Sequence, residues 1–338
     1  MTIATATTTF VRGQRGVSLV ELMIALAIGA ALIAGMIQIF TSNNAAFRTQ
    51  QTVSRMQENA RFGFHFLTTE LRQVGYRGCS GNTDAKNLLD TSSSDDEFLF
   101  DFDASLRGWA EEDLPDELNF GTTTPEEESD VVLIRRAGVL SVDMQDGQPT
   151  NDASAIKVNT GHSIEDGDIL TISDCLDSAI FQVDSASSGS EDLDVGTSSG
   201  DPGNDNTDLG NTFSDSSHIS KTFVTVFYVA ENPQGVPALY RMVNKEPPEE
   251  LVAGVERIAL EYGLDTDKTF DIPSPPPSDP DCDVDERGDD DVDTFEEAAD
   301  IDAQQCEWDQ VVGARLSILM RSQSDQVMEE QQTVRFAG

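Results

Sequence analysis

A candidate cleavage point lies directly before the most apolar segment of the chain. Residues 17–40 are apolar or small except for Ser18, Glu21 and Gln38. At about 1.5 Å per helical residue, this segment can cross a hydrocarbon core of roughly 30 Å. An ordinary secretory signal is cut after its apolar region. A cut between Gly16 and Val17 would come before that region, so the mature chain would keep the helix as a membrane anchor.

Glu21 gives this anchor a carboxylate, which is an expensive group in a membrane. A charged side chain in a membrane helix costs about 2.5–3.5 kcal/mol on insertion scales, so it usually has a partner. Cleavage would create a suitable cation, because the new α-amine of Val17 would stand at the start of the helix. The alternative is that the Glu21 side chain extends to the lipid headgroups. Arg12 and Arg15 predict that the N-terminal side of the helix lies in the cytoplasm.

The four cysteines predict disulfide chemistry. They are Cys79, Cys175, Cys282 and Cys306. None belongs to a CxxC pair, and no histidine stands near them at zinc-ligand spacing. An even number of cysteines in an exported chain favours disulfides, and the sequence alone does not select the pairing. We favour Cys282–Cys306, which would close a loop rich in Pro and Asp, with Cys79–Cys175 by elimination; four reduced core thiols are the alternative.

One acidic run has the spacing of a calcium-binding loop. Carboxylates at D-x-D-x-D spacing are the ligands that Ca²⁺ takes in an EF-hand. The candidate ligands are Asp289, Asp291, Asp293, Glu297 and Asp300. However, Thr294 stands where an EF-hand needs glycine, and chance repeats of Asp are common in so acidic a chain. A calcium site is therefore one hypothesis for residues 281–302, and a solvated acidic loop is the other.

The residue inventory offers no catalytic or cofactor-binding constellation. The histidines are His65, His162 and His218, and they are far apart in the sequence. The chain has no P-loop and no G-x-G-x-x-G motif. We therefore predict no catalytic residue, no enzymatic activity and no cofactor apart from the calcium of the hypothesis above.

A single helix is predicted from residue 17 into the seventies, with a membrane half and an amphipathic half. No proline occurs before Pro115, and apolar residues recur at steps of three and four. This face contains Met56, Ala60, Phe64, Leu67, Leu71 and Val74. The opposite, charged face contains Arg55, Glu58, Arg61, Glu70 and Arg72. Gly75 and Gly78 predict the end of the helix. An anchor followed by an unrelated core helix is the alternative.

Short runs of β-branched and aromatic residues predict antiparallel strands in the rest of the chain. These runs are Val131–Arg136, Ile169–Ser173, Ile180–Asp184, Phe223–Val229, Leu239–Val243 and Arg315–Arg321. Residues 258–264 alternate apolar and other residues, as in a sheet with one buried face. Ser185–Ser217 predicts a mobile loop, and Pro273–Pro280 a stiff turn region. We expect an α+β fold: a long helix packed on antiparallel sheet, with two β lobes as an option.

The chain therefore divides into four parts. They are a leader (1–16), the membrane half of the helix (17–40), its amphipathic half (41–76) and a globular domain (77–338). With 62 acidic and 21 basic residues, the formal net charge is −41. Such a surface repels nucleic acid phosphates, so no nucleic acid partner is expected.

Two groups of residues resemble a known family. The stretch Gly16-Val17-Ser18-Leu19-Val20-Glu21 resembles the signal of type IV prepilins, although Val17 departs from the usual Phe or Met. The stretch MQENARFGFHFLTTELRQVGYRGCSG, residues 56–81, resembles the PilW family of minor pilins. Later segments that agree are SDVVLIRRAG, ALYRMV, LVAGVERIALEYGLDTD and WDQVVGARLSILMRS. The resemblance covers both ends and scattered strands, and is weak across 80–128 and 187–217.

This resemblance implies a pilin-like fold and a structural role. An aspartate-type prepilin peptidase would cut between Gly16 and Val17 and methylate Val17, and Glu21 would pair with the N-terminal amine of a neighbouring subunit. The subunit would first be a single-pass inner-membrane protein with its N-terminus in the cytoplasm, and would then join a surface pilus. Expected partners are other minor pilins, the major pilin, the inner-membrane assembly machinery and a tip adhesin.

The same resemblance implies a minor pilin that initiates assembly at the pilus tip and supports adhesion and twitching motility. A minor pseudopilin of a type II secretion system shares the signal and the helix, and is the nearest rival. A membrane-tethered calcium- or ligand-binding module that never polymerises is a second rival, and a signal-anchored enzyme is a third.

Overall fold

The computed structural model describes most of the chain from Gly16 to Ser322. The described residues are 16–79, 85–92, 99–102, 104–110, 114, 118–121, 123–145, 147, 149–197, 200–270, 284–286, 288–301 and 307–322. The leader up to Arg15, the turn region Pro273–Pro280, and Cys282 and Cys306 lie outside them. The chain forms two compact units, one ending at Ser54 and the other beginning at Arg55.

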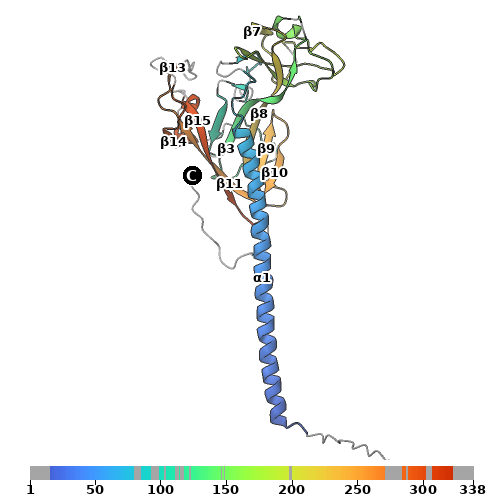
Figure 1. Ribbon diagram of the computed structural model, residues 1–338, viewed down its shortest axis with the longest axis vertical. Coiled ribbons are helices and arrows are strands. Elements are labelled where there is room, and N and C mark those ends of the chain that lie inside the picture. Colours follow the sequence, from blue (N-terminus) through green and yellow to red (C-terminus); the bar gives the residue numbers. More distant parts are fainter. Residues whose placement is uncertain are drawn as a thin grey trace, which may run out of the picture. The chain divides into compact units, whose positions relative to one another are not determined.

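One long helix, α1 (Leu19–Leu71), runs through both units (Figure 1). It confirms the prediction of a single helix, but it begins two residues later than expected, after Ser18. It also ends earlier, and a turn leads to Gly75, whose φ of +68° suits glycine. The Gly75 N–H donates to the Arg135 carbonyl at 3.1 Å, so the chain after the helix joins the sheet.

The packed face of α1 differs from the predicted face at Phe64 and at Glu70. Leu67 is fully buried as predicted, but Phe64 is 39% exposed and Gly63 is buried in its place. A Cβ built on Gly63 would lie 3.5 Å from Cδ1 of Ile318, an ordinary contact distance, so this position of the helix packs directly against that side chain. Glu70, which the sequence analysis places on the opposite, charged face, is buried.

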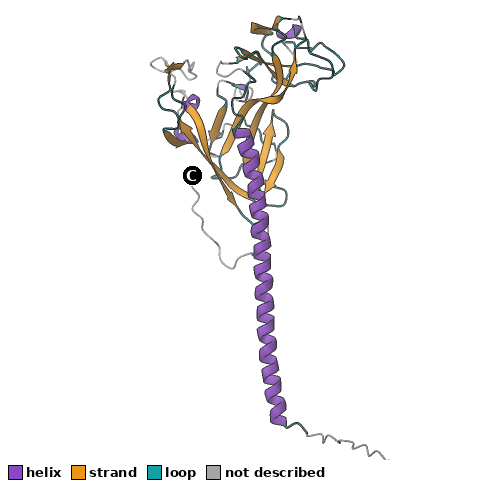
Figure 2. Ribbon diagram, viewed as in Figure 1, coloured by secondary structure: helices purple, strands orange, loops and turns teal. Residues whose placement is uncertain are grey.

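An eight-stranded sheet forms the centre of the second unit (Figure 2). Its main path is β1 (Lys86–Asn87), β6 (Ser178–Gln182), β5 (Ile169–Ser173), β8 (His218–Glu231), β3 (Val131–Asp143) and β2 (Leu106–Trp109). In addition, β9 (Pro237–Val243) pairs with β8, and β10 (Glu249–Ala253) pairs with β9. All pairs are antiparallel except β1–β6. Five of the six expected strands lie in this sheet, although the run predicted at Ile180–Asp184 forms its strand two residues earlier; the sixth, Arg315–Arg321, overlaps a strand of a second sheet.

The long strand β8 divides this sheet into two regions. Its first half pairs with β5, its second half pairs with β9, and β3 follows both halves on its other edge. Near β9, alternate residues of β3 enter different cores: Val131 and Leu133 face one core, and Val132 and Ile134 face the core that includes Leu67 of α1. Both faces are covered there, which explains why these strands are continuously apolar.

A second sheet contains β11 (Val255–Leu264) between β14 (Thr294–Glu297) and β15 (Val311–Met320). The predicted alternation is confirmed, since Ile258, Leu260, Tyr262 and Leu264 all enter the core shared with α1. Tyr262 reaches so close to β2 that a Cβ on Gly108 would lie 1.9 Å from its hydroxyl oxygen. Glycine at position 108 therefore allows the two sheets to meet. A further pair is β12 (Thr269–Phe270) with β13 (Val284–Glu286).

The prediction of a mobile loop over Ser185–Ser217 is wrong. This segment contains β7 (Asp208–Phe213), which pairs with β4 (Thr150–Asp152). Its sparse apolar residues Leu193, Val195, Leu209 and Phe213 are all buried in one core. Asn204 is also buried, and its amide side chain bonds to the backbone N–H and carbonyl of Gln182 at 2.7 and 2.8 Å. A few well-placed anchors thus order a mostly polar segment.

Asp130, just before β3, joins the two larger sheets. Its N–H donates to the Ile258 carbonyl at 3.0 Å, and its Oδ2 accepts from the Leu260 N–H at 2.7 Å. Burial raises the pKa of Asp130 to about 6; the bond from Leu260 opposes this shift, and the nearby Glu297 carboxylate adds to it.

We predict that Asp130 makes the fold less stable as pH rises from about 4 to about 7.5. The folded pKa of about 6 exceeds the usual aspartate pKa of 3.8, so the contribution of the group is complete at low pH and is lost as pH rises through about 6. Asp130→Asn keeps an oxygen acceptor but does not titrate. The melting temperature of the wild type minus that of Asp130→Asn should therefore fall over this range.

The exposed Asp205 provides the matched control. Asp205→Asn also removes one carboxylate, so its melting difference, measured over the same pH range, is subtracted to correct for the loss of one charge. A corrected difference for Asp130→Asn that stays constant with pH would contradict the assignment.

Candidate processing and assembly site

The start of α1 carries the residues expected at the processing site. Gly16, Val17 and Ser18 are exposed and precede the helix, and Val17 is 68% exposed. The Ser18 Oγ accepts a hydrogen bond from the Glu21 N–H at 3.2 Å, and its carbonyl accepts from the Leu22 N–H at 3.1 Å. Ser18 is therefore the N-cap of α1. Glu21 lies in the first turn, where the helix dipole favours a negative charge.

The first half of α1 presents apolar side chains on all sides. Its large exposed side chains include Leu19, Leu22, Met23, Ile24, Leu26, Ile28, Leu32, Ile33, Met36, Ile37, Ile39 and Phe40. By length and composition α1 can cross a membrane, and none of its most apolar window is buried by the part of the chain that the structure describes. Glu21 is the only charged residue from Val17 to Phe47. Among the described residues, no cation pairs with its carboxylate.

The other end of α1 is fixed to the sheet by a buried ion pair. Arg136 of β3 donates from Nε to Glu70 Oε2 at 2.5 Å and from Nη2 to Oε1 at 2.9 Å. The two side chains are only 13% and 11% exposed. The guanidinium also lies 4.9 Å from the centre of the Phe223 ring. A bidentate pair of this kind fixes the orientation of both side chains.

A disulfide ties the chain after α1 to the turn between β5 and β6. Cys79 and Cys175 are bonded, with an S–S distance of 2.06 Å. This confirms one of the two favoured pairings; the other, Cys282–Cys306, lies outside the described residues. The Ala137 N–H donates to the Tyr76 carbonyl at 2.5 Å, so backbone pairing supports the same junction.

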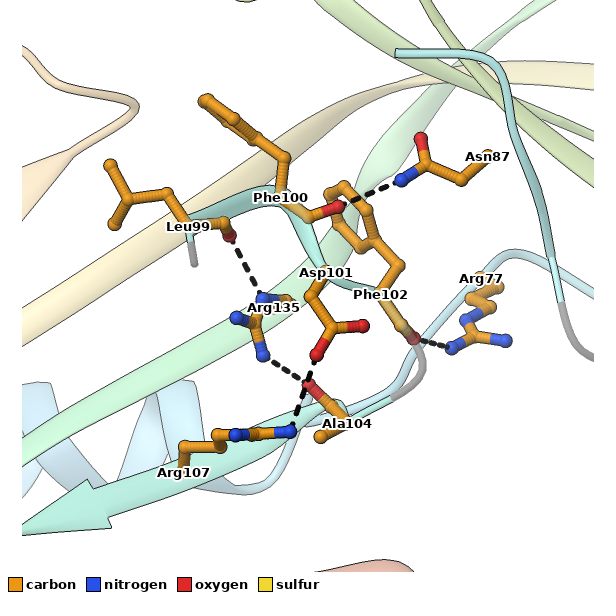
Figure 3. Close-up of polar contacts among 9 residues, drawn as sticks. All are labelled: Arg77, Asn87, Leu99, Phe100, Asp101, Phe102, Ala104, Arg107 and Arg135. Atoms are coloured by element: carbon orange, nitrogen blue, oxygen red, sulfur yellow. Dashed lines mark hydrogen bonds and ion pairs between the residues drawn. The ribbon is translucent and has the colours of Figure 1, made fainter. Parts of the chain in front are cut away.

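Side chains that the sequence analysis did not single out hold the segment Leu99–Ala104 in place (Figure 3). The donors are Arg77, Asn87 and Arg135, and the acceptors are the carbonyls of Phe102, Phe100, Leu99 and Ala104. Arg135 is 1% exposed and bonds two of these carbonyls, with Nε 2.9 Å from the Leu99 oxygen. Arg107 and Asp101 form an ion pair beside them at 3.3 Å. One sequence signal could have pointed to the role of Arg135: Arg135 and Arg136 are two adjacent charged residues in the otherwise apolar run of β3.

The predicted calcium ligands do not gather in one group. Glu297 lies in β14, Asp300 lies in the short helix η3 (Ala298–Asp300), and Asp289 accepts from the Asp291 N–H at 3.1 Å. Asp293 instead meets Asp265 and Asp267, with carboxylate oxygens within 4.8 Å of one another. The signal that would have found these two partners is the D-x-D directly after β11.

Asp265 is fully buried in this group, and backbone groups surround its carboxylate. It accepts from the Asp267 N–H at 3.1 Å and from the Asp290 N–H at 2.9 Å. A Cβ on Gly288 would lie 1.9 Å from Asp265 Oδ2, so only glycine fits there. Each carboxylate oxygen of Asp265 thus accepts a backbone hydrogen bond that needs no metal ion. Calcium binding at this group stays a hypothesis.

Comparison with known families gives two matches. Residues 226–338 match the family model described as type IV pilus-assembly protein W. Residues 11–37 match the prokaryotic N-terminal methylation motif, which covers Gly16, Val17 and Glu21. No curated protein and no solved structure gives a significant match to the chain.

We predict that Glu70→Gln destabilises the folded domain by about 3 kcal/mol, because it leaves the largely buried Arg136 charge without its counter-ion. Urea unfolding of the full chain in detergent measures this loss. The control is Glu58→Gln, an exposed position on the same helix, which should change stability by less than about 0.5 kcal/mol. Equal effects of the two variants would contradict an anchoring role for the ion pair.

The calcium hypothesis predicts that millimolar calcium raises the melting temperature of the wild type. The double variant Asp267→Asn with Asp293→Asn should lose this shift, and Asp215→Asn, an exposed change elsewhere, should keep it. A wild type that melts at the same temperature with and without calcium supports the solvated acidic loop instead.

Proposed function

We propose, from the two family matches, that this chain is a PilW-family type IV pilin with a prepilin signal and that it acts as a minor pilin that initiates pilus assembly. One observation supports the proposal most strongly: an apolar helix half that no described residue covers begins directly after the processing site and contains a single carboxylate. A structural subunit needs such a helix for packing against other subunits. A free-standing membrane module needs only an anchor.

The first step is processing by a prepilin peptidase. Hydrolysis between Gly16 and Val17 leaves α1 in the mature chain, and methylation then modifies the new amine. Arg12 and Arg15 hold the leader on the cytoplasmic side of the inner membrane. The globular domain consequently faces the outside before assembly.

The second step is transfer of α1 from lipid into a bundle of pilin helices. Glu21 pairs with the N-terminal amine of a neighbouring subunit, which offsets the desolvation cost of both charges and sets the axial register. Gly29 and Gly35 lie on this half of the helix, where the absence of a side chain lets the backbone of a partner helix come close. Other minor pilins and the major pilin supply these helices.

The finer role follows from the family resemblance. The subunit sits at the pilus tip, where its β-rich domain faces outward and supports adhesion and twitching motility. The mechanism is structural, with no catalytic step. The nearest alternative is a minor pseudopilin, which would use the same helix and the same carboxylate in a secretion system.

We predict that Glu21→Gln blocks assembly. Removing the carboxylate leaves the partner amine buried without a counter-ion, a loss of about 3 kcal/mol or roughly a hundredfold in the assembly equilibrium. In a deletion strain, the wild-type gene should restore surface filaments and twitching, and Glu21→Gln should not. Filaments sheared from the cells and probed for this protein give the measurement.

Glu58→Gln is the matched control, since it removes an exposed acid from the same helix and should complement fully. Loss of protein secretion with normal twitching in the deletion strain would favour the pseudopilin. Absence of the protein from sheared filaments of a complemented strain would contradict a pilus subunit altogether.

A further inference from the structure

The beginning of α1 leaves the scissile bond outside the helix. The helix starts at Leu19, and Gly16 and Val17 have non-helical, exposed backbone. The N–H and C=O groups of a non-helical segment are free to pair with an enzyme, whereas in a helix the carbonyls from the N-cap onward accept the helix's own bonds. The helix start thus determines whether a peptidase can reach this bond.

Ser18 determines that start. Its Oγ accepts from the Glu21 N–H at 3.2 Å and satisfies one of the backbone donors that a helix leaves free at its N-terminus. Ser18 and Glu21 also have the S-x-x-E spacing of a capping box. Both residues therefore favour a helix that begins at Leu19.

Without the Ser18 side chain, an earlier start competes. Glycine is an acceptable N-cap, and Gly16 stands two residues upstream. In lipid, unpaired backbone groups are costly, so a helix that extends is favoured over one that frays. A helix capped by Gly16 would place Val17 in its first turn and remove the scissile bond from extended chain.

We propose that Ser18 is a positioning residue for processing: by capping α1, it keeps the Gly16–Val17 bond outside the helix, where the peptidase can bind it. The inference rests on the proposed function, which supplies the peptidase. Water adds across the bond: its oxygen joins the Gly16 carbonyl carbon to form a carboxylate, and the nitrogen leaves with a proton as the Val17 amine. Ser18 exchanges no atom in this step.

This role has a kinetic signature that direct catalysis lacks. If only the non-helical form binds the enzyme, the apparent dissociation constant rises in inverse proportion to the population of that form. Loss of an N-cap shifts the local helix equilibrium by roughly two- to thirtyfold. Ser18→Ala should therefore raise KM by up to this factor and leave kcat unchanged.

The experiment uses the full-length prepilin in detergent-solubilised membranes with purified prepilin peptidase. Mass spectrometry follows the appearance of the chain that begins at Val17, for the wild type and for Ser18→Ala, Ser18→Asn and Ser18→Thr. Both Asn and Thr can cap a helix, and Asn has no hydroxyl. We expect Ala to raise KM and both Asn and Thr to restore it, because capping and not hydroxyl recognition is required.

A second readout needs no enzyme. The ¹³C chemical shift of Val17 Cα in the uncleaved chain should be non-helical in the wild type and in Ser18→Asn, and helical in Ser18→Ala. An unchanged KM for Ser18→Ala, an effect on kcat alone, failure of Asn to restore cleavage, or identical Val17 shifts would overturn the inference. A wild type that is never cleaved would overturn the proposed function instead, and the chemical shifts would still test the helix start.

Discussion

A single carboxylate in an otherwise apolar stretch of helix constrains this molecule more than any other group. Glu21 is the only charge from Val17 to Phe47, and no described cation pairs with it. The helix dipole favours a negative charge in the first turn, but it supplies only part of a counter-charge. Under the proposed assembly, the missing cation is the amine that processing creates. Cleavage and assembly are then coupled, because an uncut subunit has no free amine next to its helix.

In a subunit that assembles through its helix, contacts at the end of the helix must hold the globular domain in a fixed orientation. Three different kinds of contact do this where α1 meets the sheet. They are the bidentate Glu70–Arg136 pair, the backbone bonds of Gly75 and Tyr76 to β3, and the Cys79–Cys175 disulfide to the turn after β5. These contacts reach both β3 and the turn after β5. Because they hold the domain at more than one point, they fix its orientation on the last turns of α1.

The sequence was sufficient where the signal is local. The motif around Glu21 and the apolar runs of β3 and β8 were predictable, since a membrane span and a sheet buried on both faces each leave a continuous pattern. Positions set by distant neighbours were not predictable. Gly63, and not Phe64, is buried on the packed face, and the buried Arg135 donates to the carbonyls of Leu99 and Ala104. Every residue has a backbone carbonyl, so no sequence pattern shows which carbonyls will accept hydrogen bonds from a buried arginine. The polar segment from Ser185 was misjudged for a related reason, as a few anchors suffice to fold it.

The mature N-terminus tests the central claim most directly. Intact-mass and terminal-peptide mass spectrometry of the protein purified from surface filaments would identify the first residue and any modification on it. The account requires that the chain begin at Val17 and carry one methyl group on its amine, with α1 complete. A chain that still begins at Met1, or one that begins beyond Phe40, would contradict it, since neither could offer Glu21 of a neighbour a free amine at the start of the helix.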